Sequence, residues 1–284
     1  MRAGTRDFGP IARIRQAFRS SMTAPTASPL VVVDIGNTRL KLGVFEGPSG
    51  TPLPLPKGTL SIAHDWQAAE VDAFLPHPVP HYRWVICSVN RPACARLVDW
   101  LRKRGAEHVW EMEYTDLRVT ADVERPDYVG IDRLANVVAV NRIRPASEPA
   151  IIVDMGTALK VDLVSATGSF AGGTIAPGLE MSARALHEYT DLLPLIEVTE
   201  PETALGKSTV EAMLSGLYWG AIGAVRELAE RIVPAGSDPE IILTGGTGTL
   251  FAGALESHSA RPPQFVPHLT LAGIAIAAGA GETA

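Results

Sequence analysis

The sequence predicts an α/β protein built from a duplicated unit, on the strength of a repeat, two hairpins and the helices around them. The segment 31–38 reads VVVDIGNT, a buried-strand pattern ending in Asp-Ile-Gly, and 151–158 repeats it in kind as IIVDMGTA. A second apolar run follows each copy directly, at 40–45 and at 161–164, so each copy predicts a hairpin that turns at its glycine. Two such units predict duplicated α/β domains with a cleft between them; chance similarity of two strand ends is the alternative.

Two helices and one further strand complete this expectation. The first helix covers 131–143, where apolar residues recur at helical spacing. The second begins at Ser208, because Ser208 and Glu211 have the spacing of a capping box. It continues as a long apolar stripe, formed by Val210, Met213, Leu214, Leu217, Ala221, Val225, Leu228 and Ile232. Such a stripe is mostly core, and a dimer interface can share it. A strand at 240–243 then enters a glycine-rich turn.

These elements divide the chain into three parts. Residues 1–29 are expected to be a disordered extension, 30–145 the first α/β domain and 146–284 the second. The extension is rich in Arg and poor in acids, which leaves open an organellar transit peptide or a start codon assigned upstream of Met22.

Composition narrows the classes of function. The 284 residues are 46% hydrophobic and 20% charged, which suits a globular protein with a sizeable core. The formal net charge of −6 argues against general nucleic-acid binding, and no apolar run is long enough to predict a membrane span. Two cysteines, Cys87 and Cys94, are too few for a disulfide framework, so we expect free thiols in the cytoplasm.

The first hairpin carries groups suited to a nucleotide. Gly36 allows a tight turn that brings backbone N–H groups to phosphate oxygens, and Asn37 and Thr38 add side-chain donors. Lys41 adds positive charge. Asp34, at the end of a buried strand, is suited to hold Mg²⁺ directly or through water, because Mg²⁺ prefers few carboxylates together with substrate phosphates. A hairpin with a structural Asp is the alternative.

The second hairpin, with Asp154 and Thr157, is expected to face the first across the cleft. Phosphoryl transfer depends on positioning and charge neutralisation, which two opposed Asp/Gly turns would supply. The tetrapeptide 130–133, Gly-Ile-Asp-Arg, opens the first helix, where N–H groups favour anions. Asp132 is a candidate general base, and Arg133 a candidate partner for a carboxylate or phosphate. A helix cap and a surface Arg are the alternative for these two residues.

Six motifs in order resemble those of the type III pantothenate kinases, in the acetate and sugar kinase/actin-like superfamily. They are Asp-x-Gly-Asn-Thr with Lys41, Gly-x-Asp-Arg at 130–133, Asp-x-Gly-Thr-Ala at 154–158, Gly-Gly-x-Ile-x-Pro-Gly at 172–178, Gly-Lys-Ser-Thr at 206–209 and Thr-Gly-Gly at 244–246. The resemblance spans roughly residues 30 to 278. It implies duplicated actin-like (ribonuclease H-like) domains with the nucleotide between them, and ATP-dependent phosphorylation of pantothenate to 4′-phosphopantothenate, the first step of coenzyme A biosynthesis.

The resemblance also implies roles for particular residues. The segment from Asp34 to Lys41 corresponds to the ATP phosphate loop, Asp132 to the catalytic base, and Gly130, Ile131, Asp132 and Arg133 to the pantothenate-binding turn. Asp154 matches a monovalent-cation ligand, Thr157 a nucleotide contact, and Thr209 a pantothenate contact near the subunit interface. The implied cofactors are Mg²⁺ with ATP and K⁺ or NH₄⁺, and the implied assembly is a homodimer.

Three positions depart from the family pattern. Val123 stands where the family often has Tyr, and Tyr128 is out of register, so one substrate contact is unassigned. Thr247 replaces the usual Asp, and Lys160 replaces a Thr. If the Lys160 ammonium lies beside Asp154, it supplies the charge for which the family uses K⁺; a side chain that points into solvent is the alternative, since side chains alternate faces along a strand.

Two other functions remain open from the sequence. One is a catalytically weak regulatory or accessory factor of the same fold, against which the retained residues Asp34, Lys41, Asp132 and Asp154 argue. The other is a kinase of the superfamily that acts on another small substrate, because the departures fall partly in the substrate pocket.

Overall fold

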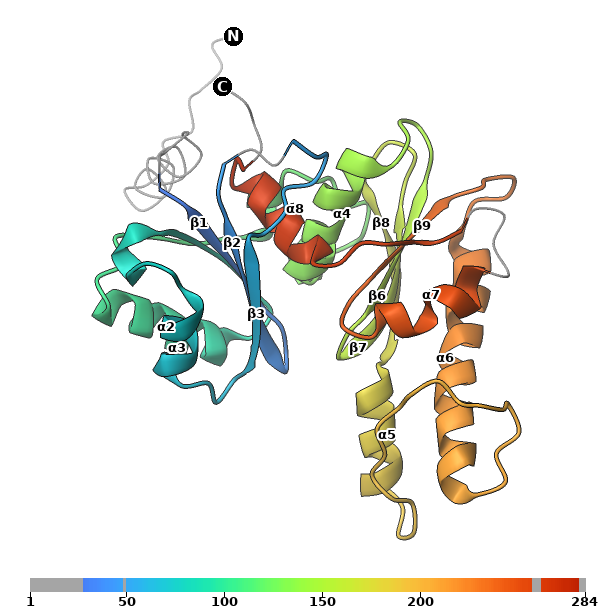
Figure 1. Ribbon diagram of the computed structural model, residues 1–284. Coiled ribbons are helices and arrows are strands. Elements are labelled where there is room, and N and C mark those ends of the chain that lie inside the picture. The colour runs from blue at the N-terminus through green and yellow to red at the C-terminus, as the bar shows by residue number, and fades with distance from the viewer. Residues whose placement is uncertain (1–27, 48–49, 257–261, 281–284) are drawn as a thin grey trace. The chain divides into compact units, whose positions relative to one another are not determined.

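The fold was analysed in a computed structural model, which describes residues 28–47, 50–256 and 262–280 (Figure 1). The predicted extension 1–29 therefore lies outside the described residues, except for its last two. The chain divides into two compact units, residues 1–117 with 274–284 and residues 118–273. Because 131–143 falls in the second unit, this division differs from the domain boundary expected after residue 145.

The first unit contains a five-stranded sheet in the order β3-β2-β1-β4-β5. Its strands are β1 (Leu30–Ile35), β2 (Arg39–Phe45), β3 (Gly58–Ala63), β4 (Arg83–Ser88) and β5 (His108–Glu111). The first three strands are antiparallel neighbours, whereas β4 and β5 join in parallel. Its described residues also form helices α2 (Ala68–Phe74) and α3 (Arg91–Lys103) and the short 3₁₀ helices Val79–His81 and Tyr114–Leu117.

The second unit repeats this topology strand for strand. Its strands are β6 (Ala150–Met155), β7 (Ala158–Val164), β8 (Phe170–Pro177), β9 (Glu240–Thr244) and β10 (Gln264–Phe265). Their order, β10-β9-β6-β7-β8, is that of the first sheet read from the other edge, again with three antiparallel strands followed by two parallel ones. The predicted duplication is therefore confirmed at the level of sheet topology.

The described residues after the first unit also form a 3₁₀ helix, Pro126–Tyr128, and the helices α4 (Ile131–Ile143), α5 (Leu179–Glu188), α6 (Thr209–Ile232), α7 (Gly248–Glu256) and α8 (Leu269–Ala277). The division between the units falls inside α8. The bounds predicted for the helix at 131–143 are confirmed, as is the capping box of α6, in which Ser208 Oγ accepts from the Glu211 N–H at 3.2 Å and Glu211 Oε2 accepts from the Ser208 N–H at 3.2 Å.

Side chains of the central strand β6 alternate between the two faces of the sheet. Ile151, Val153 and Met155 point to one face, where they join a core with Tyr218 of α6 and Phe251 of α7. Residues of the other parity include Asp154, and α4 packs against this strand. The acidic side chain of Asp154 is thus held at a buried position, 7% exposed, where a charge needs a partner.

The glycine-rich segment 172–178 lies mostly inside β8, and Gly178 is the N-terminal cap of α5. In the pairing of β8 with β7, Gly173 opposes Asp162 so closely that a Cβ at 173 would lie 2.2 Å from Asp162 Oδ1. Gly173 therefore leaves space for the Asp162 side chain within the sheet.

The two thiols should be protected in the folded protein. Cys87 is fully buried and Cys94 is 8% exposed, and burial together with the charge of Glu111 raises the pKa of Cys94 to about 11. We expect an aromatic disulfide reagent at mildly alkaline pH to react with neither thiol until unfolding opens the first unit, and with both in denaturant. Rapid reaction of Cys94 in the native protein would contradict this packing.

Candidate functional site

The second hairpin sets an aspartate opposite a lysine. Asp154 on β6 and Lys160 on β7 are Cα partners, and the turn between the strands closes with the Gly156 N–H donating to the Ala158 carbonyl at 3.2 Å. The first hairpin has the same arrangement, with Asp34 opposite Lys41. Lys160 is therefore the counterpart of Lys41 in the second copy. The two sequence motifs do not show this directly, because the second turn is one residue shorter and the lysine follows its aspartate by six positions instead of seven.

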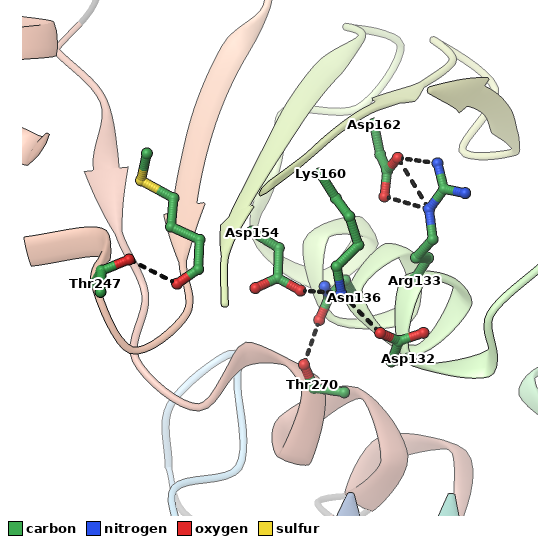
Figure 2. A network of polar contacts seen from close by, with 9 residues as sticks. Asp132, Arg133, Asn136, Asp154, Lys160, Asp162, Thr247 and Thr270 are labelled. Atoms are coloured by element: carbon green, nitrogen blue, oxygen red, sulfur yellow. Dashed lines mark hydrogen bonds and ion pairs between the residues drawn. The ribbon is translucent and has the colours of Figure 1, made fainter. Parts of the chain in front are cut away.

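Lys160 joins two carboxylates from different elements. Its Nζ lies 2.7 Å from Asp154 Oδ2 and 2.8 Å from Asp132 Oδ2. Figure 2 shows the lysine between the two carboxylates. The three side chains are only 10–18% exposed, so the alternative in which Lys160 points into solvent is wrong. Burial alone would lower the pKa of Lys160, but the charges of Asp154 and Asp132 and its hydrogen bonds to both outweigh it, and the pKa lies above its ordinary value.

Asp132 reaches this lysine because of its place at the start of α4. It lies in the first turn, where the helix dipole favours a negative charge. The N-cap is Gly130, and a Cβ there would lie 2.5 Å from Asp132 Oδ1, so a larger residue would displace the carboxylate. No described residue donates a hydrogen bond to Oδ1 of Asp132. One oxygen of this carboxylate is therefore anchored, and the other is available to a ligand.

Arg133 forms a second buried ion pair beside the first. Its Nε lies 3.1 Å from each carboxylate oxygen of Asp162, its Nη2 contacts Asp162 Oδ1, and its guanidinium lies 5.0 Å from the ring centre of Phe170. Asp162 is fully buried, and this burial, opposed by the hydrogen bonds and charge of Arg133, raises the pKa of its carboxyl group. In the structure Arg133 thus binds Asp162 of the same unit.

A buried amide lies next to these pairs and was not anticipated from the sequence. Asn136 is one helical turn after Asp132 and fully buried; its Oδ1 accepts from Thr270 Oγ1 of α8 at 2.8 Å, and its Nδ2 has no partner among the described residues. The close packing of α8 on α4 explains this contact, because a Cβ on Gly273 would lie 1.8 Å from the Ala135 carbonyl oxygen. The sequence feature that could have pointed to Asn136 is its position four residues after Asp132, on the same face of the helix.

The glycine-rich turn after β9 packs against the end of β6, next to the turn of the second hairpin. Thr247, which replaces the Asp of the family pattern, donates from its N–H at 3.2 Å and from its Oγ1 at 3.0 Å to the Met155 carbonyl. Gly245 has φ +95°, and a Cβ there would lie 2.4 Å from the same carbonyl oxygen. The turn residue Thr157 in turn accepts at its carbonyl from the Gly178 N–H at 3.1 Å.

The first hairpin brings together the residues expected to hold ATP. Asp34 is 7% exposed at the end of β1, Lys41 is partly buried, and Asn37 and Thr38 are exposed in the turn, which closes with the Gly36 N–H donating to the Arg39 carbonyl at 3.0 Å. A single buried carboxylate beside an exposed turn suits Mg²⁺, which keeps water and phosphate ligands. The expected donor set therefore fits this metal.

The remaining predicted residues lie outside these clusters. Thr209 is the exposed first residue of α6, and Val123 lies near Gly172. Tyr128 is 78% exposed just before α4, with the Arg125 guanidinium 4.2 Å from its ring centre.

Comparison with known proteins places these features in a family. The model of the type III pantothenate kinase family matches residues 30–231. A type III pantothenate kinase of Dehalococcoides mccartyi is 36% identical over 87% of this chain and 96% of its own length. The chain belongs to the type III pantothenate kinase family. Another type III pantothenate kinase, from Symbiobacterium thermophilum, is 36% identical over 86% of this chain and 94% of its own length.

Solved structures support the fold of this family member. A putative 2-dehydro-3-deoxygalactonokinase from Sinorhizobium meliloti matches 88% of the chain and 98% of its own length, with TM-score 0.52 and 15% identity. The ethanolamine utilization protein EutJ from Carboxydothermus hydrogenoformans covers 90% of the chain and 91% of its own length, with TM-score 0.50 and 13% identity. With the repeated sheet topology, these matches agree with the predicted duplicated actin-like domains.

The Arg133–Asp162 pair should contribute strongly to the stability of the second unit. Asp162→Asn leaves Arg133, 12% exposed, without its counter-charge, and we expect the free energy of unfolding to fall by about 3–5 kcal/mol. Urea unfolding followed by circular dichroism measures this change. Asp127→Asn is the matched control, since it breaks the exposed pair with Arg125 and should leave the urea midpoint unchanged. Equal midpoints for the two variants would contradict the assigned role.

Proposed function

We propose that this protein transfers the γ-phosphoryl group of ATP to the primary hydroxyl of pantothenate, giving 4′-phosphopantothenate for coenzyme A biosynthesis. The observation that carries the proposal is the Asp132 carboxylate, anchored through Oδ2 to Lys160 while no described residue donates to its Oδ1. Membership in the type III pantothenate kinase family supplies the substrate pair.

The first hairpin is proposed to bind the phosphates of ATP. The backbone around Gly36, the side chains of Asn37 and Thr38, and the charge of Lys41 suit phosphate oxygens, and Thr157 of the second hairpin is a further proposed nucleotide contact. Asp34 would hold Mg²⁺ directly or through water. When bound, Mg²⁺ neutralises charge on the phosphate oxygens during transfer.

Asp132 is proposed to act as the general base. Its Oδ1 accepts the proton of the pantothenate hydroxyl as that oxygen forms its bond to the γ-phosphorus and the bond to the β-phosphate oxygen of ATP breaks. The remaining products are ADP and a protonated Asp132, which returns its proton to water. The hydrogen bond from Lys160 fixes the orientation of the carboxylate before the substrate arrives.

Pantothenate is proposed to bind at the start of α4. Backbone N–H groups in the first turn, after Gly130 and Ile131, suit its carboxylate or amide oxygens. Because the Arg133 guanidinium already binds Asp162, its proposed part in substrate binding is the shaping of this turn. Thr209 is the remaining proposed pantothenate contact, near the interface between two copies.

We further infer a homodimer formed through the end of the second unit where α5 and α6 lie side by side (Figure 1). Large apolar side chains are exposed on these helices and the segment between them: Met181, Tyr189, Leu192, Leu195, Leu205, Val210 and Trp219. Such an apolar group is unusual on the surface of a monomer, and a second copy of this chain would bury it. Of the apolar stripe predicted for α6, Val210 at its start belongs to this exposed group, whereas Met213 and Val225 are buried.

The competing functions are a kinase for another small substrate and a catalytically weak accessory factor. We propose the cytoplasm as the place where this enzyme of coenzyme A biosynthesis works. No helix in the described part of the chain is long and apolar enough to span a membrane.

The reaction and its base can be tested together. Purified protein with Mg-ATP and pantothenate should give 4′-phosphopantothenate by mass spectrometry. Asp132→Asn should lower kcat by about 10²-fold or more, because a positioned base is lost. Asp99→Asn, which removes an exposed partner of Lys103 on α3, is the control and should keep full turnover. Normal turnover in the Asp132→Asn protein would remove Asp132 from the mechanism, and no product from the wild type would refute the proposed function.

The dimer should depend on the exposed apolar group. Light scattering should give twice 30.2 kDa for the wild type. Leu192→Asp, at a residue 86% exposed, should shift the protein to monomer without changing its far-ultraviolet circular dichroism spectrum, because the side chain contributes little to the core. Leu55→Asp, at a 59% exposed residue of the first unit, is the control and should remain dimeric. A dimeric Leu192→Asp protein would sink this assignment of the interface.

A further inference from the structure

The duplicated hairpins allow a comparison within the chain itself. In each copy a buried aspartate at the end of the first strand is the Cα partner of a lysine on the second: Asp34 with Lys41, and Asp154 with Lys160. In the second copy the ammonium lies within hydrogen-bond distance of both Asp154 and Asp132. One fixed positive charge therefore serves two carboxylates that come from a strand and a helix.

This geometry does not fit a monovalent metal ion at Asp154. An ion such as K⁺ is bound through several oxygen ligands that replace its hydration shell, whereas Asp154 Oδ2 here accepts from Lys160 at 2.7 Å. A K⁺ ion on the same carboxylate would lie a few ångströms from the ammonium, in a setting where the three side chains are at most 18% exposed, and the two like charges would repel strongly.

We propose that Lys160 is a built-in cation, which occupies the place of a monovalent metal ion and makes the catalytic site of this chain independent of K⁺ and NH₄⁺. The inference rests on the proposed kinase function. Lys160 is a positioning residue in this account, since it acts through Asp132 and Asp154 rather than on the substrates. Its length matters, because one side chain from β7 must reach carboxylates on β6 and α4 at the same time.

The proposal is tested first by turnover in buffers that differ only in the cation. Replacing Tris or Na⁺ with K⁺ or NH₄⁺ should change wild-type kcat by less than about twofold, well below the usual range of coupling between two sites. Lys160→Thr removes the ammonium and leaves room for an ion. Its kcat should be low without K⁺ and rise about tenfold or more on adding K⁺. Lys103→Thr, which removes an exposed lysine on α3, should behave as the wild type.

Thermal unfolding supplies a readout that does not need activity. An ion that binds only the folded protein raises its melting temperature, so K⁺ in place of Na⁺ should raise that of Lys160→Thr by about 2 °C or more and leave the wild type unchanged. If the wild type makes no 4′-phosphopantothenate in any salt, the proposed function fails, while these melting curves still decide whether Lys160 replaces the ion.

Strong activation of the wild type by K⁺, or a rise in its melting temperature with K⁺, would overturn the proposal. A folded Lys160→Thr protein that is indifferent to K⁺ in both measurements would do so as well. Should Lys160→Thr fail to fold in every salt, the two wild-type measurements carry the test alone, because a K⁺-independent wild type is the direct expectation.

Discussion

The arrangement of the second unit depends on charges buried between α4 and the sheet. Lys160 and Asp162 lie two residues apart on β7 and so project to the same face, where they meet Asp132 and Arg133 at the start of α4. Each pair has opposite charges and little access to water, so the loss of one partner leaves an isolated buried charge. These contacts fix both the position of the helix along the strands and the direction in which the Asp132 carboxylate points.

Glycine residues make this packing possible by removing side chains at points of close approach. A Cβ at Gly130 would collide with the Asp132 carboxylate, and one at Gly173 with Asp162. Gly245 supports the hairpin turn from behind, where its φ of +95° and its distance to the Met155 backbone both exclude larger residues. These three glycines of the family motifs are therefore explained by the space that charged side chains and a hairpin turn need. This explanation does not depend on a contact with a nucleotide.

Duplication of one hairpin has given two sites of different character. Both copies pair Asp with Lys across the strands, but the turn in the first is longer and carries the exposed donors Asn37 and Thr38. In the second copy the lysine lies between two carboxylates, because α4 brings Asp132 to it. In the proposed kinase mechanism, the first arrangement would bind the phosphates of a nucleotide, and the second would hold a carboxylate in place for proton transfer.

The sequence by itself determined the duplicated α/β fold, the start of α4, the capping box of α6 and the candidate residues Asp132 and Lys160, because each depends on local periodicity or a short motif. It left Lys160 with two possible directions, and it gave no sign that Arg133 binds Asp162 or that Asn136 meets Thr270. Those contacts join residues 29 and 134 positions apart, through strand register and helix packing. Only the tertiary structure decided them, because side-chain partners at such separations depend on how α4, α8 and the sheet pack together rather than on any pattern along the chain.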